Sequence, residues 1–438
     1  MSFSLYPSYK DSGVEWLGEV PEHWKIGRLK NIAKIRSGRD YKDVETEDEE
    51  AIPVIGSGGP FTYATEHLFD GESVLLGRKG TVDNPLYIKG RFWTVDTMFY
   101  TEIDSRAVPK FVYYLATVIP FSYYSTSTAL PSMSQFDLSN HRIVFPGMIE
   151  QKQIARFLGH ETAKIDALIK EQQRLIELLK EKRQAVISHA VTKGLDPNVP
   201  TKDSGVEWLG KVPEHWMVSK LKFMTNHVVD CPHETPLYDP EGDYLVIRTA
   251  DIDQGVLKLE RMYRLQHSEY LNRIRRLPLR KSDVVYGREG ERWGHAALVP
   301  KSDLFALGQR MVQFRVTAHI SPEFFMYQLN SGAVYRQGEV DTVGATAPHV
   351  NISTIVNYQM VVPPLEEQLQ IFLYLDETLH VLDNLIAESI GMIDLLQERR
   401  SALISATVTG KIDVRSWHPP ELLSHDSYQA SDSCLESI

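Results

Sequence analysis

Cysteine is scarce in this chain of 438 residues, which holds only Cys231 and Cys434. Two cysteines so far apart, one of them in a polar tail, give no disulfide framework, and their scarcity favours a reducing cytoplasm. No apolar run approaches the ~18 residues of a membrane span. Residues 1–10 show neither the basic nor the apolar region of a secretory signal. We therefore predict a cytoplasmic protein, long enough for two or more domains.

Catalytic signatures are missing as well. The sequence holds no Gly-x-x-x-x-Gly-Lys-Ser/Thr phosphate loop, no Cys-x-x-Cys pair, no His-Glu-x-x-His and no Gly-x-Ser-x-Gly elbow. His227, Cys231 and His233 lie close together, but no second ligand pair stands near them, so we predict no metal site. The sequence thus predicts a protein that is not an enzyme, with no catalytic residue and no cofactor of its own.

What the chain does contain is a repeat. Residues 10–30 and 202–222 are identical at 16 of 21 positions, and both carry Gly-Val-Glu-Trp-Leu-Gly-x-Val-Pro-Glu-His-Trp, here called the tryptophan motif. A helical pattern that opens at Glu150-Gln151 returns at Glu367-Gln368, 217 residues later. The order of tryptophan motif, variable block and long helix therefore occurs twice. Two half-molecules of this kind predict a target that also comes in two halves.

Both variable blocks favour strands. The β-type runs between Gly, Pro and Asn signals are residues 73–76, 86–88, 91–100, 244–247, 283–286 and 311–316. Short helices with Pro near their start are predicted at 109–117 and 322–330. We therefore predict an α+β fold with two homologous, β-rich domains. The predicted parts are the first domain with its motif (1–144), a first long helix (145–193), the second domain with its motif (194–361), a second long helix (362–414) and a disordered tail (415–438).

The two long helices have the heptad spacing of a coiled coil. Their apolar seams are interrupted by polar residues at matching places, which predicts that the helices pack on each other. The alternative is that each helix only covers its own domain. The predicted seam positions are Ile154, Leu158, Ile165, Leu168, Leu175, Leu179, Ile371, Leu375, Leu382, Leu385, Met392 and Leu396.

Local charge favours DNA binding even though the net charge of the chain is −11. Residues 258–292 hold ten Lys or Arg against five Asp or Glu. Gly77-Arg78-Lys79-Gly80 and Gly287-Arg288-Glu289-Gly290 each follow a strand-like run, and their glycines let a loop approach a phosphate or a groove edge closely. Each charged residue alone is compatible with an ordinary solvated surface, whereas the cluster predicts a nucleic-acid interface.

Arginine reads guanine, and amide side chains such as those of Gln135 and Asn351 read adenine, although either amide residue also suits a turn or a cap. The candidate DNA contacts are Arg78, Lys79, Ser132, Ser134, Gln135, Arg273, Arg275, Arg276, Lys281, Arg288, Arg292, His349 and Asn351.

The tryptophan motif itself is interpreted structurally. Its two tryptophans, Trp16 and Trp24 in the first copy and Trp208 and Trp216 in the second, lie eight residues apart with a Pro-Glu turn between them. We expect them to clamp the first strand of each domain onto the base of a helix. Glu150 and Glu367 each stand at a predicted helix start, where a carboxylate is favoured by the helix dipole. No chemistry is assigned to either feature.

These residues resemble the specificity subunits of type I restriction-modification systems. The resemblance rests on the two tryptophan motifs, on Leu-Pro-Ser-Met-Ser-Gln-Phe-Asp-Leu-Ser-Asn at 130–140 and on Pro-Pro-Leu-Glu-Glu-Gln at 363–368, and it covers the chain to about residue 415. The first copy reads Pro-Gly-Met-Ile-Glu-Gln at 146–151 where the family usually has Pro-Pro-Leu. We expect only a local turn difference there.

The resemblance implies two target-recognition domains in a pseudo-twofold arrangement, each reading one half of a bipartite site in double-stranded DNA. It implies that the two long helices form an antiparallel coiled coil that spaces these domains. It also implies two methyltransferase subunits and two motor-nuclease subunits as partners. S-adenosylmethionine, ATP and Mg²⁺ would be bound by those partners and not by this chain.

Two other functions compete with this one. A pseudo-dimeric coiled-coil scaffold for other proteins would account for the helices and the repeats, but not for the Gly-Arg-x-Gly loops or the arginine cluster. A stand-alone nuclease would need a carboxylate pair, which the sequence does not offer. Charge reversal at Arg288 and Arg292 separates the DNA-reading function from the scaffold, because a scaffold would still assemble and would lose nothing on DNA.

Overall fold

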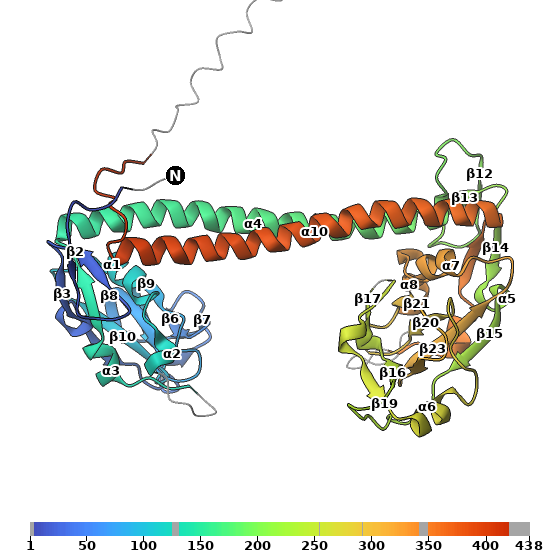
Figure 1. Cartoon of the computed structure of the whole chain (residues 1–438), viewed down its shortest axis with the longest axis horizontal. Coiled ribbons are helices and arrows are strands. Elements are labelled where there is room, and N and C mark those ends of the chain that lie inside the picture. Colours follow the sequence, from blue (N-terminus) through green and yellow to red (C-terminus); the bar gives the residue numbers. More distant parts are fainter. Residues whose placement is uncertain (1–3, 125–130, 254, 291, 341–348, 420–438) are drawn as a thin grey trace, which may run out of the picture. The chain divides into compact units, whose positions relative to one another are not determined.

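The computed structural model describes residues 4–124, 131–253, 255–290, 292–340 and 349–419. The chain divides into two compact units: unit 1 comprises Met1–Gln172 with Gly391–Ile438, and unit 2 comprises Gln173–Ile390. Each unit combines one β-rich domain with a stretch of each of two long helices, α4 (Met148–Lys193) and α10 (Leu365–Val408) (Figure 1). The predicted α+β class is confirmed. Among the described residues, no helix has the length and apolar character needed to cross a membrane.

The domain of unit 1 is built on a mixed sheet of seven strands. In spatial order the strands are β4 (Ala33–Ser37), β10 (Met98–Ile103), β8 (Phe69–Gly77), β9 (Leu86–Thr94), β6 (Ile52–Gly56), β7 (Gly59–Ala64) and β5 (Glu45–Thr46). Helices α1 (Pro109–Ala116), α2 (Phe121–Tyr124) and α3 (Gln135–Asn140) follow the sheet. Strand β3 (Lys25–Arg28) pairs with β11 (Arg142–Phe145), which leads the chain into α4.

The domain of unit 2 has two smaller sheets in place of one large sheet. One has the order β15 (Thr225–Asp230), β23 (Met311–Val316), β20 (Val284–Gly287) and β21 (Ala296–Leu298), and the other β19 (Tyr263–Leu265), β16 (Tyr244–Ile247) and β22 (Phe305–Leu307). Its helices include α6 (His267–Ile274), α7 (Pro322–Leu329), α8 (Gly332–Val340) and α9 (Ile352–Ile355). Strand β14 (Met217–Lys220) pairs with β24 (Gln359–Val362), as β3 pairs with β11 in unit 1.

The predicted strands and short helices recur in the structure with one clear exception. Residues 86–88 and 91–100 were expected to form two separate runs, but β9 joins 86–88 with 91–94 in one strand and β10 begins at Met98. The amide of Met98 donates to the carbonyl of Val95 in a tight turn between them. A polar Asp96 at this turn, between two apolar stretches, is the signal that separates the strands.

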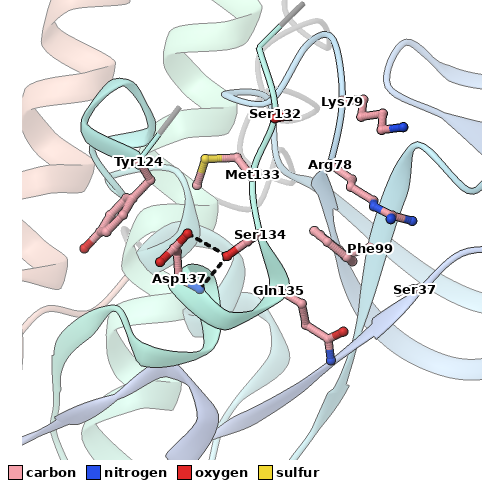
Figure 2. A pocket seen from close by; sticks show the side chains of 10 residues that line it. All are labelled: Ser37, Arg78, Lys79, Phe99, Tyr124, Ser132, Met133, Ser134, Gln135 and Asp137. Carbon is pink, nitrogen blue, oxygen red and sulfur yellow. Dashed lines mark hydrogen bonds between the residues drawn. The ribbon is translucent and has the colours of Figure 1, made fainter. Parts of the chain in front are cut away.

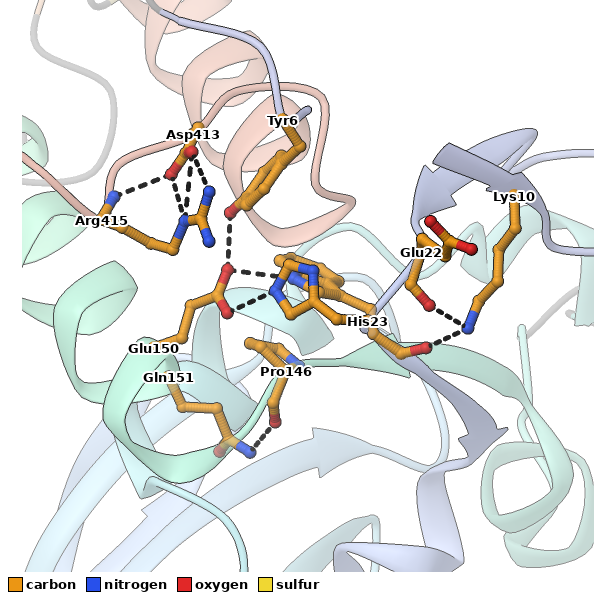
Figure 3. A network of polar contacts seen from close by, with 10 residues as sticks. Tyr6, Lys10, Glu22, His23, Pro146, Glu150, Gln151, Asp413 and Arg415 are labelled. Carbon is orange, nitrogen blue, oxygen red and sulfur yellow. Dashed lines mark hydrogen bonds and ion pairs between the residues drawn. The ribbon is translucent and has the colours of Figure 1, made fainter. Parts of the chain in front are cut away.

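The tryptophan motif fastens each domain to the first turn of its long helix. Trp24 is fully buried, and its indole N–H donates to the carboxylate of Glu150 at 3.0 Å. Nε2 of His23 lies 2.8 Å from the same carboxylate, and the hydroxyl of Tyr6 donates to it at 2.8 Å (Figure 3). Burial and this hydrogen bond raise the pKa of Tyr6 far above its ordinary value. The predicted clamp is therefore present at Trp24, with Glu150 as its polar partner.

Unit 2 repeats the same joint. Trp216 is fully buried and donates to the carboxylate of Glu367 at 3.0 Å, while Nε2 of His215 lies 2.8 Å from that carboxylate. The other tryptophan of each motif, Trp16 or Trp208, is only partly buried. Each motif thus contributes one deeply buried indole and one at the margin of the domain.

The glutamine that follows each of these glutamates joins the domain to the helix from the other side. Oε1 of Gln151 accepts from the amide of Val108, directly before α1, and its Nε2 donates to the carbonyl of Pro146 (Figure 3). Oε1 of Gln368 accepts from the amide of Ser321, directly before α7, and its Nε2 donates to the carbonyl of Pro363. Both glutamines are buried, so their polar atoms need these partners. The repeated Glu-Gln pair is therefore structural in both copies.

Within each unit the two long helices run antiparallel. Asp166 pairs with Arg400 at 2.8 Å in unit 1, and Arg183 pairs with Asp383 at 2.9 Å in unit 2. In unit 1 the contact of Gln153, near the start of α4, is with Val414, which follows α10, so a later residue of α4 meets an earlier one of α10. In unit 2, Gly194 directly after α4 lies beside Glu367 at the start of α10, which gives the same direction. The prediction that the helices pack on each other is confirmed in both units.

The predicted seam is only partly correct. Eight of its twelve residues are buried, and six of those belong to clusters that also contain domain side chains. The remaining four are between 42% and 52% exposed, namely Leu168, Leu175, Leu385 and Met392. They lie outside both clusters. A helix with only one neighbouring helix keeps part of its apolar stripe in water, and burial of the whole stripe requires the additional cover of a domain.

The segment after α10 packs onto unit 1. The amide of Asp413 donates to the carbonyl of Ser4, and Nε2 of Gln153 donates to the carbonyls of Val414 and Trp417. The ring of Trp417 meets that of Phe157 edge to face at 5.3 Å. The expectation of a disordered tail from residue 415 is therefore wrong for residues 415–417. Residues 420–438 lie outside the described residues.

Candidate nucleic-acid interface

Unit 1 brings five of the predicted DNA contacts together around one pocket of about 370 Å³. The loop with Arg78 and Lys79 lies beside the segment from Ser132 to Gln135 (Figure 2). Two backbone hydrogen bonds join these segments: the amide of Met133 donates to the carbonyl of Arg78, and that of Gly80 to the carbonyl of Pro131, both at 2.9 Å. Residues more than 50 positions apart in sequence thus form one surface.

Arg78 is held in place while most of its donors remain available. One terminal nitrogen donates to the carbonyl of Asp96 at 3.2 Å, and the guanidinium lies over the ring of Phe99 at 5.8 Å. Such a contact with an aromatic face orients a guanidinium without using its N–H groups. Lys79 next to it is exposed. The two residues give this edge of the pocket a positive charge.

The opposite edge is set by the start of α3. Ser134 caps this helix, since its hydroxyl oxygen accepts from the amide of Asp137 at 3.0 Å, and the hydroxyl also donates to the Asp137 carboxylate (Figure 2). Gln135 donates its amide to the carbonyl of Ile35 at 2.9 Å and remains exposed. Ser134, and not Gln135, therefore caps this helix.

Several pocket residues were not found from the sequence. Ser37, Phe99, Tyr124 and Asp137 line the pocket together with the predicted residues. They come from β4, β10, α2 and α3, so only the tertiary fold brings them together. No local sequence signal distinguishes them from ordinary surface positions.

Beneath this pocket lies a buried histidine at the end of α3. His141 is 1% exposed, its Nδ1 lies 2.7 Å from the hydroxyl of Tyr124, and Trp16 stacks on its ring at 5.3 Å. Burial lowers the pKa of His141 to about 4, so the ring is neutral at neutral pH. Trp16 of the tryptophan motif thereby supports the element that carries Gln135.

Unit 2 builds the corresponding loop with the same backbone pairing. The amide of Val350 donates to the carbonyl of Arg288 at 2.9 Å, and Glu289 forms an isolated bridge with His349. In unit 1 the matching bridge joins Lys79 and Ser132. The Gly-Arg-x-Gly loop therefore contacts the segment that opens the next short helix in both units. Asn351 precedes α9 and is exposed, and its side chain makes no capping hydrogen bond.

The charges of the second loop are engaged within the protein. Nε of Arg288 donates to the carboxylate of Asp230 at 3.2 Å, and the Arg288 side chain is 10% exposed. Glu289 pairs with Arg310 at 3.1 Å. Arg288 therefore differs from Arg78 and does not present its guanidinium to solvent. Asp230 and Arg310, which hold this loop, were not found from the sequence.

The arginine cluster of unit 2 has a different role from the one predicted. Arg273 has a side chain only 1% exposed, and it donates to the carbonyls of Leu307, Pro232 and Glu234. The expectation that Arg273 contacts DNA is wrong, because the interior already occupies its donors. Arg276 donates to the carbonyl of Asp230 at 2.9 Å but is exposed. Arg273 and Arg276 thus hold residues 230–234 in place, and this segment includes Asp230, the partner of Arg288.

Three further candidates remain on the surface of unit 2. Arg275, Lys281 and Arg292 are exposed. Arg292 donates weakly to the carbonyl of Ile252 at 3.4 Å, which places it beside the second loop. These residues, unlike Arg273, place positive charge on the surface of unit 2.

Comparison with known proteins identifies the family of the chain. The sequence profile of the family described as type I restriction modification DNA specificity domain matches residues 21–178 and 213–390, more than half of the chain. The chain belongs to this family. It is the DNA specificity subunit of a type I restriction-modification system, a non-catalytic component of the enzyme. The two matched regions correspond to the two sequence repeats, as the resemblance in sequence implied.

The chain is also similar over nearly its whole length to specificity subunits of other type I restriction enzymes. The chain is 24% identical to the type I restriction enzyme MjaVIII specificity subunit of Methanocaldococcus jannaschii, over 91% of this chain and 95% of that protein. It is 21% identical to the EcoBI specificity subunit of Escherichia coli, over 98% of this chain and 94% of that protein. A solved chain from work on complex assembly and conformational transition of the type I R-M system covers 89% of this chain with a TM-score of 0.66 and 16% identity. This last likeness supports the fold.

Proposed function

We propose that each domain of this specificity subunit reads one half of a bipartite DNA site, through the surface around its Gly-Arg-x-Gly loop. The observation that carries the proposal is the duplicated pairing of this loop with the segment before the following short helix. Arg78 with Met133 in unit 1 and Arg288 with Val350 in unit 2 make the same backbone bond at 2.9 Å. The two domains share this backbone pairing but differ in the side chains around it, as expected if they recognise different half-sites.

The chemistry of the first surface fits base reading in the major groove. Arg78 retains donors suited to the O6 and N7 acceptors of guanine, and Gln135 carries an amide of the kind that pairs with adenine. Ser132, His349 and Asn351 supply short polar groups at the corresponding places of the two units. Lys79, Arg275, Lys281 and Arg292 are suited to phosphate contacts, which position the protein without reading sequence.

The helices α4 and α10 would then serve as the spacer between the two readers and as the docking site for two methyltransferase subunits. Two motor-nuclease subunits would complete the restriction enzyme. S-adenosylmethionine, ATP and Mg²⁺ belong to those partners in this proposal. Linking two readers in one body gains affinity and specificity because the second half-site is met at a high effective concentration.

Methylation sequencing of the host genome, with and without this gene, tests the proposal. Loss of one bipartite N6-methyladenine motif on deletion is the expected result, and its return on complementation supplies both half-sites. Complementation with Arg78→Gln should alter one half of the motif and leave the other half unchanged. Arg91→Gln is the matched control, because Arg91 is an exposed arginine of the same domain that pairs with Asp70 outside the pocket. An unchanged methylome on deletion, while the methyltransferase is expressed, would favour the scaffold function.

The spacer role has its own test. Inserting one heptad between residues 164 and 182 of α4, with a matching heptad opposite it in α10, lengthens the helix pair by about 10 Å. This corresponds to about three base-pair steps of 3.4 Å. The accepted gap between half-sites should grow accordingly in the methylome. An unchanged gap in a complex that still assembles and methylates would contradict the spacer role.

A further inference from the structure

A second basic pocket lies on the domain of unit 1, away from the Gly-Arg-x-Gly loop. It measures about 440 Å³ and is lined by Ile26, Gly27, Arg28, Lys30, Asn31 and Arg142. All three of its cationic side chains are exposed. It shares no lining residue with the pocket around Arg78. Among the described contacts of the joint between domain and helix, none involves these three cations.

The arrangement of charge in this pocket is unfavourable for the protein alone. Arg28 on β3 stands directly opposite Arg142 on β11 in the antiparallel pair. Like charges at directly opposed positions destabilise a sheet. Within the described parts of the chain, no carboxylate pairs with Arg28, Lys30 or Arg142. An anion bound between them would turn this repulsion into attraction.

A neutral acceptor organises two of the cations. One terminal nitrogen of Arg28 and Nζ of Lys30 both donate to the side-chain oxygen of Asn140, at 2.8 and 2.9 Å. Asn140 fixes the two side chains without neutralising them, and each keeps further N–H donors for a ligand. Three cations held around one open pocket suit the oxygens of a phosphate group, which Arg binds bidentately and Lys binds as a point charge.

We propose that Arg28, Lys30 and Arg142 bind a backbone phosphate of the DNA whose bases the Arg78 pocket reads. This assignment rests on the proposed function of the domain. Helix α3 connects the two pockets, because Gln135 at its start lines the first and Asn140 at its end holds Arg28 and Lys30. The five helical rises from Gln135 to Asn140 span about 7.5 Å, which is close to two base-pair steps. One short helix would thus fix the register between base reading and phosphate binding.

Unit 2 carries a weaker version of the same pocket. Lys220 and Lys222 occupy the positions that Arg28 and Lys30 hold in the first repeat, and Asn357 takes the place of Asn140. The residue opposite Lys220 is Gln359, so the third cation is missing. This pocket of the first domain should therefore contribute more to the salt-dependent affinity than its counterpart in the second domain, a difference that follows from the sequence of the two repeats.

Fluorescence anisotropy with the full-length chain and short DNA duplexes between 50 and 200 mM salt tests the phosphate site. One duplex holds the bipartite motif found by methylation sequencing, and the other holds an unrelated sequence of equal length. Arg28→Gln or Arg142→Gln should weaken binding to both duplexes by the same factor. Each should also reduce the slope of log K against log salt by about one, so that the loss of affinity is about fourfold larger at 50 mM than at 200 mM.

Matched variants make each outcome decisive. Lys25→Gln removes an exposed cation from the same strand outside the pocket and should leave the slope unchanged, while Arg28→Lys should restore it. Slopes for Arg28→Gln and Arg142→Gln equal to that of Lys25→Gln would overturn the proposal. A change in preference between the two duplexes would also overturn it, because a phosphate contact carries no sequence information. Wild-type protein that does not distinguish the duplexes at all would instead refute the proposed base-reading function.

Discussion

The indole N–H of Trp24 donates to the carboxylate of Glu150 across 3.0 Å, joining the start of the domain in unit 1 to the first turn of α4. Glu150 stands where the unpaired amides of a helix start favour a negative charge. Trp24 adds a fully buried aromatic surface to the same joint. One contact therefore combines hydrophobic burial with a charge-assisted hydrogen bond, and the identical pair Trp216–Glu367 explains why the motif recurs unchanged.

We expect Trp24→Phe to destabilise unit 1 by about 2 kcal/mol, because a hydrogen bond to a charged group contributes about 1.5–3 kcal/mol. The phenyl ring keeps most of the apolar contact, so the loss reports mainly the missing N–H. Urea unfolding followed by circular dichroism measures the change. Glu22→Gln in the same motif is the control, because Glu22 is exposed and should leave the midpoint unchanged. Equal midpoints for Trp24→Phe and wild type would show that the hydrogen bond from Trp24 to Glu150 does not stabilise unit 1.

Arg273→Met should destabilise unit 2 without changing the DNA motif. The substitution leaves the carbonyls of Leu307, Pro232 and Glu234 without their donor, and a buried unsatisfied polar group costs about 1–3 kcal/mol. Thermal unfolding should show this loss. Arg275→Met, two residues away and exposed, should leave the melting temperature unchanged and act, if anywhere, on DNA affinity. The reverse pattern would restore Arg273 as a DNA contact.

The arginines of unit 2 show what could and could not be predicted from the sequence. The duplication and the long helices could be predicted, because repeats and periodicity are local signals, whereas the pairing of each Gly-Arg-x-Gly loop with a later segment appears only in the fold. The difference between Arg78 and Arg288 could not, since it depends on Asp230 reaching Arg288 from another strand. Burial of Arg273 likewise depends on carbonyls 34 to 41 residues away along the chain. Composition marks an arginine as charged, while only the fold decides whether it faces inward.

The stability of unit 1 should depend on pH through His141. Its pKa is about 4 in the folded protein, against about 6.5 in an unfolded chain. Between these values the unfolded chain binds a proton that the folded protein does not, so stability falls as pH decreases from 6.5 to 4. The shift corresponds to at most about 3 kcal/mol. Unfolding free energies measured at intervals over this range should show the decline.

His141→Phe tests the assignment of that pH dependence. Phenylalanine retains an aromatic ring beneath Trp16 and cannot bind a proton, so the decline between pH 6.5 and 4 should become shallower. His67→Phe is the matched control, because it removes a histidine from the same domain at an exposed position. If His141→Phe and wild type lose stability in parallel over this range, other groups are responsible for the acid sensitivity.

The uneven burial along α4 and α10 gives a last prediction about stability. Ile154 and Ile371 are fully buried in clusters shared with the domains, whereas Leu168 and Leu385 are 52% and 42% exposed. Replacing a buried isoleucine by alanine costs about 2–5 kcal/mol, since it removes apolar contacts and leaves a cavity. Ile154→Ala and Ile371→Ala should therefore lower the unfolding free energy strongly, and Leu168→Ala and Leu385→Ala by no more than about 1.5 kcal/mol. Ile154 and Ile371 occupy equivalent positions of the two repeats, as do Leu168 and Leu385. A large loss at both isoleucines and a small loss at both leucines would show that burial against the domains, and not the heptad pattern alone, stabilises the helices. Equal losses at all four positions would mean that the helices pack on each other as a uniform seam.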